Sequence, residues 1–283
     1  MRTRGVSRGA AAWIAALAAL IAPAPAAADY VALGDSYTAG PLIPLQIAPF
    51  GCLKSNSNYA HLAAPRLGQP AFRDPSCSGA TTEDMTAPQD VTPGPNPPQF
   101  DALDADTRIV TFTIGGNDIG FTGIAENCVS PVPTGTFCKA DYVHDGRDEI
   151  SERIAATAPK VAAVIRGIRA RAPRARIFVL NYAAIFPERG SLGCWPQLPV
   201  ADGDIAYLRE KQKELNAMLA TQAVANRARL IDWYRASIGH DACKPPLIRW
   251  VEPLAPANAA APIHPNLLGM IGAANLVAAA AAR

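Results

Sequence analysis

The chain has 283 residues, of which 49% are hydrophobic and 18% are charged, a balance that suits a globular protein with a sizeable core. The formal net charge is only +2, so the composition gives no reason to expect a nucleic-acid partner or an anionic membrane surface.

The first 28 residues have the pattern of a secretory signal peptide. Arg2, Arg4 and Arg8 give a positive start, and residues 10–22 form an apolar segment too short to span a bilayer. The small residues Ala26–Ala28 predict cleavage before Asp29. We therefore expect an extracellular protein with one domain over residues 29–283 and no stable membrane insertion after cleavage. A retained N-terminal anchor is the alternative.

Several segments with strand or helix patterns follow one another along the chain. Apolar or β-branched runs predict strands at residues 30–33, 71–77 (weak), 108–114, 176–181 and 229–233. A helical period predicts helices at residues 58–67, 149–171, 204–227 and 267–282, and a further helix should start near Ser36. Residues 41–50 are broken by prolines, and residues 121–143 are rich in turn residues, so both read as loops. The alternation predicts a flavodoxin-like three-layer α/β/α sandwich with a parallel sheet.

The cysteines number six, an even count that behind a signal peptide implies disulfides. They are Cys52, Cys77, Cys128, Cys138, Cys194 and Cys243. Fifteen pairings are open, and pairing neighbours in order is the simplest. Because no Cys-x-x-Cys spacing occurs, we expect neither a zinc site nor redox chemistry, and no cofactor is implied.

Polar residues follow three of the predicted strands. Ser36 comes directly after the strand that ends at Leu33, in the crevice where open α/β sheets bind ligands. Gly79 follows the weak strand, and Asn117 follows the strand of residues 108–114. The alternatives are a helix cap at Asp35 or Ser36 and an ordinary turn glycine at Gly79.

Three motifs occur in order along the chain: Gly-Asp-Ser ending at Ser36, Gly-Gly-Asn-Asp containing Asn117, and His-Pro-Asn beginning at His264. Together they resemble the SGNH (GDSL-type) hydrolases, in particular secreted lipases and esterases of actinomycete type. The resemblance implies Ser36 as nucleophile and His264 as base. It further implies an oxyanion hole made of the Ser36 and Gly79 N–H groups and the Asn117 amide, and disulfides between neighbouring cysteines. No Gly-x-Ser-x-Gly occurs, which excludes the α/β-hydrolase alternative.

One position departs from the family pattern. Members commonly carry an aspartate three residues before the histidine, where this chain has Ala261. We therefore expect a Ser36–His264 dyad whose imidazole is oriented by a main-chain carbonyl, that of Ala261. Asp232, Asp241 and Glu252 remain open as substitute acids. His61, His144 and His240 are rivals to His264 by residue type, but none of them lies in a matching motif.

The resulting hypothesis is a monomeric, extracellular ester hydrolase acting on lipid or small-molecule acyl esters. Two alternatives stay open: a polysaccharide deacetylase, and a non-catalytic binding module, which the absent acid at Ala261 would favour.

Overall fold

Five parallel strands form the central sheet of the computed structural model, which describes residues 29–68 and 71–283. The sheet order is β4-β1-β5-β8-β9. The strands are β1 (Tyr30–Gly34), β4 (Phe72–Arg73), β5 (Ile109–Thr113), β8 (Arg176–Leu180) and β9 (Arg229–Ile231). The predicted signal peptide of residues 1–28 lies outside the described residues and stays a prediction.

The helices vary widely in length. They are α1 (Ser36–Ala39), α2 (Tyr59–Ala63), α3 (Phe121–Asn127), α4 (Lys139–Tyr142), α5 (Glu149–Arg171), α6 (Asp202–Ala225), α7 (Trp233–Ala236) and α8 (Leu267–Ala281). Two short antiparallel ribbons pair β2 (Gln46–Ile47) with β3 (Lys54–Ser55), and β6 (Val143–His144) with β7 (Arg147–Asp148).

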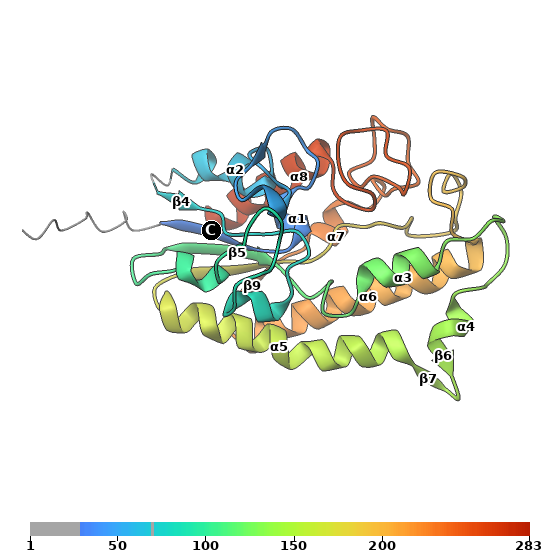
Figure 1. Cartoon of the computed structure of the whole chain (residues 1–283), viewed down its shortest axis with the longest axis horizontal. Coiled ribbons are helices and arrows are strands. Elements are labelled where there is room, and N and C mark those ends of the chain that lie inside the picture. Colours follow the sequence, from blue (N-terminus) through green and yellow to red (C-terminus); the bar gives the residue numbers. More distant parts are fainter. Residues whose placement is uncertain (1–28, 69–70) are drawn as a thin grey trace, which may run out of the picture.

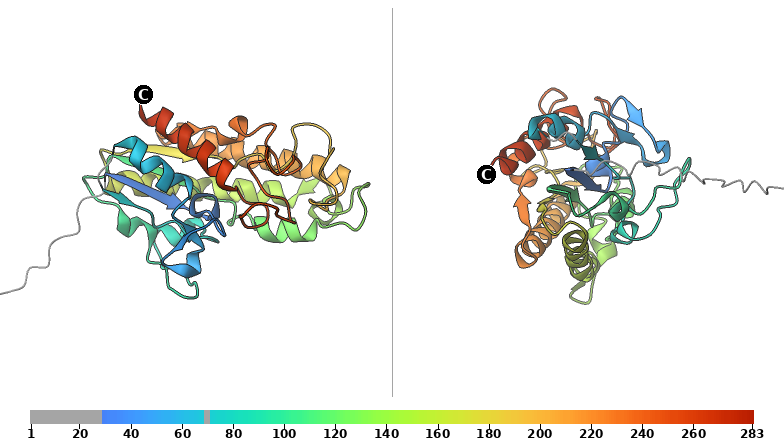
Figure 2. Two further views of the ribbon diagram at one scale, coloured as in Figure 1. Left: turned by 90° about the horizontal axis from the view of Figure 1, so that it is seen from above. Right: turned by 90° about the vertical axis from the view of Figure 1, so that its left-hand side faces the viewer.

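Helices cover both faces of the sheet. The long helices α5 and α6 lie side by side below it in Figure 1, and α2 and α8 pack together above it. Figure 2 shows the same layers from the end of the molecule. Strands β1 and β5 are buried along their whole length, as expected for central strands of a parallel sheet. The predicted three-layer α/β/α sandwich is therefore confirmed.

The register of β1 and β5 brings two predicted motifs to the same edge. Gly34 lies opposite Thr113, so Ser36 and Asn117, which follow these residues, leave the sheet side by side. Because parallel strands end at a common edge, the site of the molecule lies where the five strands finish.

Several element boundaries differ from the sequence-based expectations. α1 has only four residues, since Gly40 ends it in a left-handed conformation at φ 73°. The weak strand shortens to Phe72–Arg73, and Pro65 converts the end of the predicted helix at 58–67 into a 3-10 turn, Ala64–Leu67. The expected loop at residues 121–143 contains α3 and α4, whereas Pro159 lies inside α5 without ending it.

The six cysteines form three buried disulfides, Cys52–Cys77, Cys128–Cys138 and Cys194–Cys243, which is the pairing of neighbours in order. The Cys128–Cys138 bridge closes a segment outside the sheet, whereas the segments closed by Cys52–Cys77 and Cys194–Cys243 contain the edge strands β4 and β9. In residues 29–68 and 71–283, no helix combines the length and the apolar character needed to cross a membrane.

Candidate active site

Ser36 is placed by the abrupt end of β1. Gly34 has φ 130°, and a Cβ atom there would lie 2.4 Å from the Thr113 carbonyl oxygen, so the strand can turn only at a glycine. Asp35 then caps α1, accepting a hydrogen bond from the Tyr37 N–H at 2.9 Å. Ser36 is consequently the first residue of α1, at the edge of the sheet.

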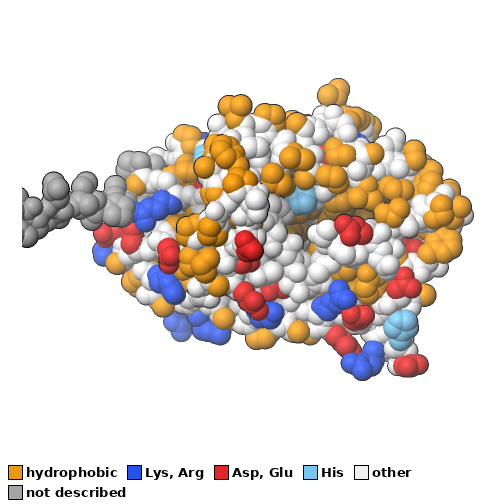
Figure 3. All heavy atoms as spheres, viewed as in Figure 1, with side chains coloured by type: hydrophobic (Ala, Val, Ile, Leu, Met, Phe, Trp, Pro, Cys, Tyr) orange, Lys and Arg blue, Asp and Glu red, His pale blue; other side chains and the backbone are white. Residues whose placement is uncertain are grey.

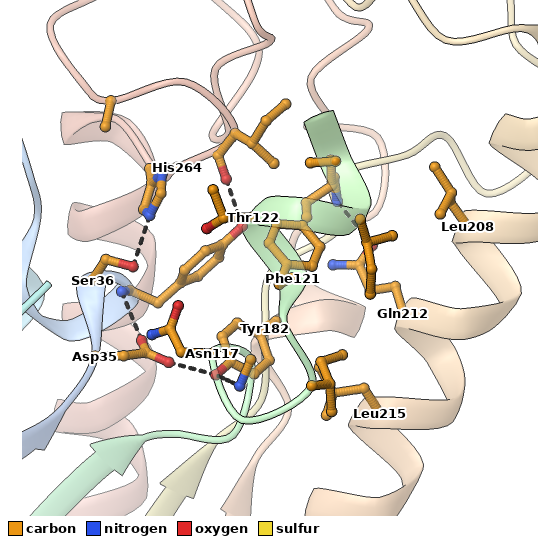
Figure 4. A pocket seen from close by; sticks show the side chains of 18 of the residues that line it. Asp35, Ser36, Asn117, Phe121, Thr122, Tyr182, Leu208, Gln212, Leu215 and His264 are labelled. Atoms are coloured by element: carbon orange, nitrogen blue, oxygen red, sulfur yellow. Dashed lines mark hydrogen bonds between the residues drawn. The ribbon is translucent and has the colours of Figure 1, made fainter. Parts of the chain in front are cut away.

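The hydroxyl of Ser36 points at the imidazole of His264. The distance from Ser36 Oγ to His264 Nε2 is 2.7 Å, and the other ring nitrogen, Nδ1, lies 2.7 Å from the Pro262 carbonyl oxygen. A carbonyl oxygen can only accept, so Nδ1 carries the proton and Nε2 presents a lone pair to the serine hydroxyl. Figure 4 shows this pair at one side of the cavity. This arrangement allows His264 to take the proton of Ser36.

The carbonyl at the histidine corrects the expectation from the sequence. A main-chain carbonyl does orient the ring, but it belongs to Pro262 and not to Ala261. The Ala261 carbonyl instead accepts a hydrogen bond from the His264 main-chain N–H at 3.2 Å. The cause is Ile263, whose left-handed conformation (φ 62°) folds the chain so tightly that the carbonyl two residues before the ring reaches it.

Main-chain bonds fix the loop that carries His264. Glu252 and the histidine segment run antiparallel, with the Glu252 N–H donating to the His264 carbonyl at 2.9 Å and the Ile263 N–H donating to the Glu252 carbonyl at 3.1 Å. The buried Tyr37 hydroxyl donates to the Ile263 carbonyl at 2.8 Å, which links this loop directly to α1. The strained residue is therefore held from both sides.

The Glu252 side chain ties the same loop together from within. Its carboxylate forms a buried ion pair with Arg249, at 2.7 Å, and accepts hydrogen bonds from the side-chain amides of Asn258 and Asn266, both at 2.7 Å. Burial by itself would raise the pKa of Glu252, but these donors outweigh it and lower the pKa to about 2. Glu252 is thus a structural carboxylate of this loop.

None of the carboxylates that could replace the missing acid contacts the His264 ring. Asp232 caps α7, Asp241 accepts from the Cys243 N–H, and Glu252 is engaged as described above. The rival histidines also lie elsewhere: His61 bonds with Asn58, and His240 stacks on Trp250 with ring centroids 4.6 Å apart. In the part of the chain that the structure describes, Ser36 and His264 form a pair without a third acidic side chain.

A second buried carboxyl group, Asp35, lies beside the serine. Its Oδ2 atom accepts a hydrogen bond from the Tyr182 hydroxyl at 2.5 Å, and that hydroxyl accepts from the Gly116 N–H at 2.6 Å. Burial raises the pKa of Asp35 to about 7, although its hydrogen bonds oppose this shift. Tyr182 thereby connects the ends of β1, β5 and β8. Its position two residues after the strand ending at Leu180 was the signal in the sequence that could have identified it.

Three groups that could stabilise an oxyanion surround the same cavity. The N–H groups of Ser36 and Gly79 have no hydrogen-bond partner among residues 29–68 and 71–283. Gly79 has φ 81°, a conformation that favours glycine. Asn117 uses its amide nitrogen to bond the Ala80 carbonyl at 2.8 Å, which leaves a second N–H of the amide available and fixes its loop against that of Gly79.

The cavity beside Ser36 has a volume of about 210 Å³ and extends under α3 to α6. Figure 4 shows Phe121 of α3 and the residues Leu208 and Leu215 of α6 facing it, on the side away from His264. Its other lining side chains are mostly apolar, and include Ile124, Ile150, Ile185, Leu198, Val200 and Leu254. A hydrocarbon chain fits such a lining better than a polar group does.

Burial also affects the histidine itself. It lowers the pKa of His264 below the ordinary value for an imidazole, and the bond to the Pro262 carbonyl opposes this shift only in part. Near neutral pH the ring is therefore held in the neutral form that a base requires.

Comparison with known proteins agrees with this geometry. Residues 32–270 match the GDSL-like lipase/acylhydrolase family. Lipase 2 of Streptomyces coelicolor is 41% identical over 247 residues, which cover 85% of this chain and 81% of the relative. An esterase of Streptomyces scabiei is 26% identical, over 75% of this chain and 72% of the relative.

A solved structure shows the same fold. The extracellular lipase of Streptomyces rimosus superimposes with a TM-score of 0.73 at 25% identity. The superposition covers 90% of this chain and 100% of the lipase chain. The family match spans most of the chain and includes all three motifs. The chain therefore belongs to the GDSL-like lipase/acylhydrolase family and is a carboxylic ester hydrolase.

Proposed function

We propose that Ser36 and His264 carry out the hydrolysis as a dyad. The observation that carries this proposal is the bond from Ser36 Oγ to His264 Nε2, combined with the Pro262 carbonyl that keeps the proton on Nδ1. Ser36 Oγ attacks the ester carbonyl carbon while its proton passes to Nε2, and His264 then gives that proton to the leaving alcohol. A water molecule, activated by the same nitrogen, cleaves the acyl–serine bond and releases the carboxylic acid.

The negative charge of the tetrahedral intermediate is held by the N–H groups of Ser36 and Gly79 and by the Asn117 amide. The unpaired N–H groups support this role, because donors that are already in place need no reorganisation when the charge develops. The link between Asn117 and Ala80 keeps these donors at a fixed separation. Each such donor typically contributes about a hundredfold or more to the rate.

The substrate class that the site supports best is a lipid ester. The cavity of about 210 Å³ beside Ser36 is lined mostly by aliphatic and aromatic side chains, which suits the acyl chain of the substrate. An acetyl group would leave most of this apolar surface empty, so the deacetylation of a polysaccharide is the less favoured alternative. The similarity to proteins named lipase and esterase supports the same choice.

We further propose that the enzyme works outside the cell as one domain over residues 29–283. The three disulfides favour an oxidising compartment, and the predicted signal peptide agrees with export. A monomer is sufficient, because the dyad and the three oxyanion donors all come from one chain.

A panel of p-nitrophenyl esters from acetyl to palmitoyl, together with acetylated xylan, tests this function. Wild type should prefer a chain longer than acetyl, and Ser36→Ala should lose at least about a thousandfold in kcat/KM while keeping its melting temperature. Ser57→Ala, a serine outside the cavity, serves as the matched control and should be unchanged. Activity on acetyl groups alone would favour the deacetylase. No reaction of the wild type with esters or with a fluorophosphonate probe would favour the binding module.

A further inference from the structure

A loop with no charged residue forms one rim of the cavity. We call Pro41–Leu53 the apolar rim; it contains no Asp, Glu, Lys, Arg or His. Four of its large hydrophobic side chains are exposed: Leu42 by 50%, Leu45 by 70%, Phe50 by 58% and Leu53 by 41%. The next residue, Lys54, is buried, and its ammonium group bonds the Asp74 carbonyl, so it adds no charge to this surface.

Exposure of this kind costs free energy, because each large apolar side chain left in water forgoes the gain that burial would bring. The backbone of the rim makes the exposure a fixed feature. Leu42 and Leu53 both have left-handed conformations, at φ 62° and 48°, which are unfavourable for leucine. Strain that persists at the mouth of a site points to a use for that geometry.

The rim is also held rigidly. Its middle contains β2, which pairs with β3 just after the rim. Its end is joined to Cys77 by the Cys52 disulfide, and Gly51 donates a hydrogen bond to the Pro93 carbonyl at 3.0 Å. Ile43 is only 1% exposed and anchors the loop in the core. The exposed side chains are therefore presented by a fixed support, and ordering them on a partner surface costs little conformational entropy.

The rim continues directly into the proposed active site. Pro41 and Leu53 line the same cavity as Ser36 and His264, and the Pro41 carbonyl accepts a hydrogen bond from the Ala261 N–H at 3.0 Å. In Figure 1 the loop lies above α1, and Figure 3 shows that the surface above the central hollow is mostly apolar, while charged side chains gather below it. A partner seated on the rim would thus lie over the entrance of the cavity.

We infer that the apolar rim docks the enzyme onto the surface of aggregated, uncharged acyl lipid, such as an emulsified triacylglycerol. This inference rests on the proposed function, since it takes the cavity to be the acyl site. The absence of charge on the rim fits an uncharged surface and not an anionic one. The exposed leucines and phenylalanine enter the lipid surface, and ester groups pass from it into the cavity without first dissolving in water.

The test compares dissolved and emulsified substrate. The variant carries Leu45→Ser and Phe50→Ser, two exposed positions that do not line the cavity. The control is Val224→Ser, which is similarly exposed at 75%, but lies near the end of α6, next to the start of β9 and away from the strand ends. All three proteins should have similar melting temperatures, and each single substitution is made as well in case the double variant is unstable.

With p-nitrophenyl butyrate below its solubility limit, we expect the double variant to keep kcat/KM within about twofold of wild type. With emulsified triolein, its rate should fall at least tenfold, and Val224→Ser should match wild type on both substrates. Equal losses on both substrates, or no loss on the emulsion, would overturn the inference.

Adsorption to the droplets separates docking from catalysis. Binding to the droplets is measured by flotation with proteins that all carry Ser36→Ala, so that no lipid is consumed. Adding Leu45→Ser and Phe50→Ser to this inactive protein should weaken its binding to the droplets at least tenfold. If wild type fails to cleave dissolved esters although Ser36→Ala adsorbs through the rim, the proposed function is wrong and not the docking surface. If the rim substitutions leave adsorption unchanged, the docking surface is wrong.

Discussion

The proposed base, His264, can accept a proton from Ser36 only while its Nε2 atom is unprotonated. Since burial lowers the pKa of His264, its neutral form persists to a lower pH than an ordinary histidine allows. We therefore predict that kcat/KM for a soluble ester is constant near neutral pH and falls about tenfold per pH unit on the acid side. The midpoint of this fall should lie below about 6.5, the usual pKa of histidine.

Asp35 provides the control for this profile, because its pKa of about 7 also places it in the measured range. An Asn at this position can still cap α1 through its Oδ1 atom, with its NH2 group donating to the Tyr182 hydroxyl in place of the bond that Asp35 accepts, so Asp35→Asn removes the titration and keeps the helix cap. The acid limb should remain at the same pH in this variant. A limb that disappears in Asp35→Asn, or a wild-type midpoint above about 6.5, contradicts the assignment to His264.

The sequence predicts the residues of the candidate site better than the bonds between them. Ser36, Gly79, Asn117 and His264 all line one cavity, because strand ends in a parallel sheet meet at one edge. The identity of the orienting carbonyl depended on the left-handed φ of Ile263, a conformation that β-branched residues rarely adopt and that no local pattern indicates.

At the scale of elements, the segment from Arg249 to Asn266 is the one on which the proposed base depends. Both oxygens of the Glu252 carboxylate face N–H donors, those of Arg249 and of the two asparagine amides. In Glu252→Gln one of these oxygens becomes an NH2 group, which would point at another donor. We predict that this variant loses about 3 kcal/mol of unfolding free energy, as for other broken buried ion pairs. Its kcat on a soluble ester, measured well below the melting temperature, should fall less than tenfold.

The pH dependence of the same variant carries a definite sign. The pKa of Glu252 is about 2 in the folded protein, below its ordinary value. The ionised carboxylate therefore contributes its full share to the free energy of unfolding above about pH 4.5, and this share is lost as the pH falls toward 2. The difference in melting temperature between wild type and Glu252→Gln should thus shrink from pH 6 to pH 3. Glu126→Gln, at an exposed site, is the control. A loss of about ten-thousandfold in kcat without unfolding would make Glu252 the missing acid.

Long elements were predictable and short ones were not. The helix predicted at 149–171 has the bounds that the structure gives α5, and β5 and β8 agree within one residue at each end with their predictions. In contrast, α3 lies in a segment of mixed composition with a glycine inside it, where seven residues give too little periodicity to stand out. Short elements of this kind are set by packing on the rest of the molecule, which a local pattern does not contain.

At the scale of the whole molecule, the sheet and long helices form a continuous core, while the site is built from segments that leave it. The disulfides fasten these segments: Cys52–Cys77 joins the apolar rim to the loop of Gly79, and Cys194–Cys243 joins the β8–α6 connection to the segment that leads to His264. All six cysteine side chains are buried. The active site should therefore be the part of the molecule that is most sensitive to loss of the bridges.

Removing the bridges one at a time tests how much each of them constrains the unfolded chain. The bridges Cys128–Cys138, Cys52–Cys77 and Cys194–Cys243 close separations of 10, 25 and 49 residues. From these separations, the loop-entropy relation gives stabilisations of the folded protein of about 2.7, 3.5 and 4.1 kcal/mol, respectively, at 25 °C. Three variants each replace the two cysteines of one bridge with alanine. Because each variant loses two sulfur atoms and so gains a cavity of similar size, the order of their stabilities reports the loop-closure entropy of the unfolded chain. We predict that the unfolding free energy, measured in urea, decreases least for Cys128→Ala/Cys138→Ala and most for Cys194→Ala/Cys243→Ala. The reverse order would show that native packing around each bridge, and not chain entropy, decides its contribution.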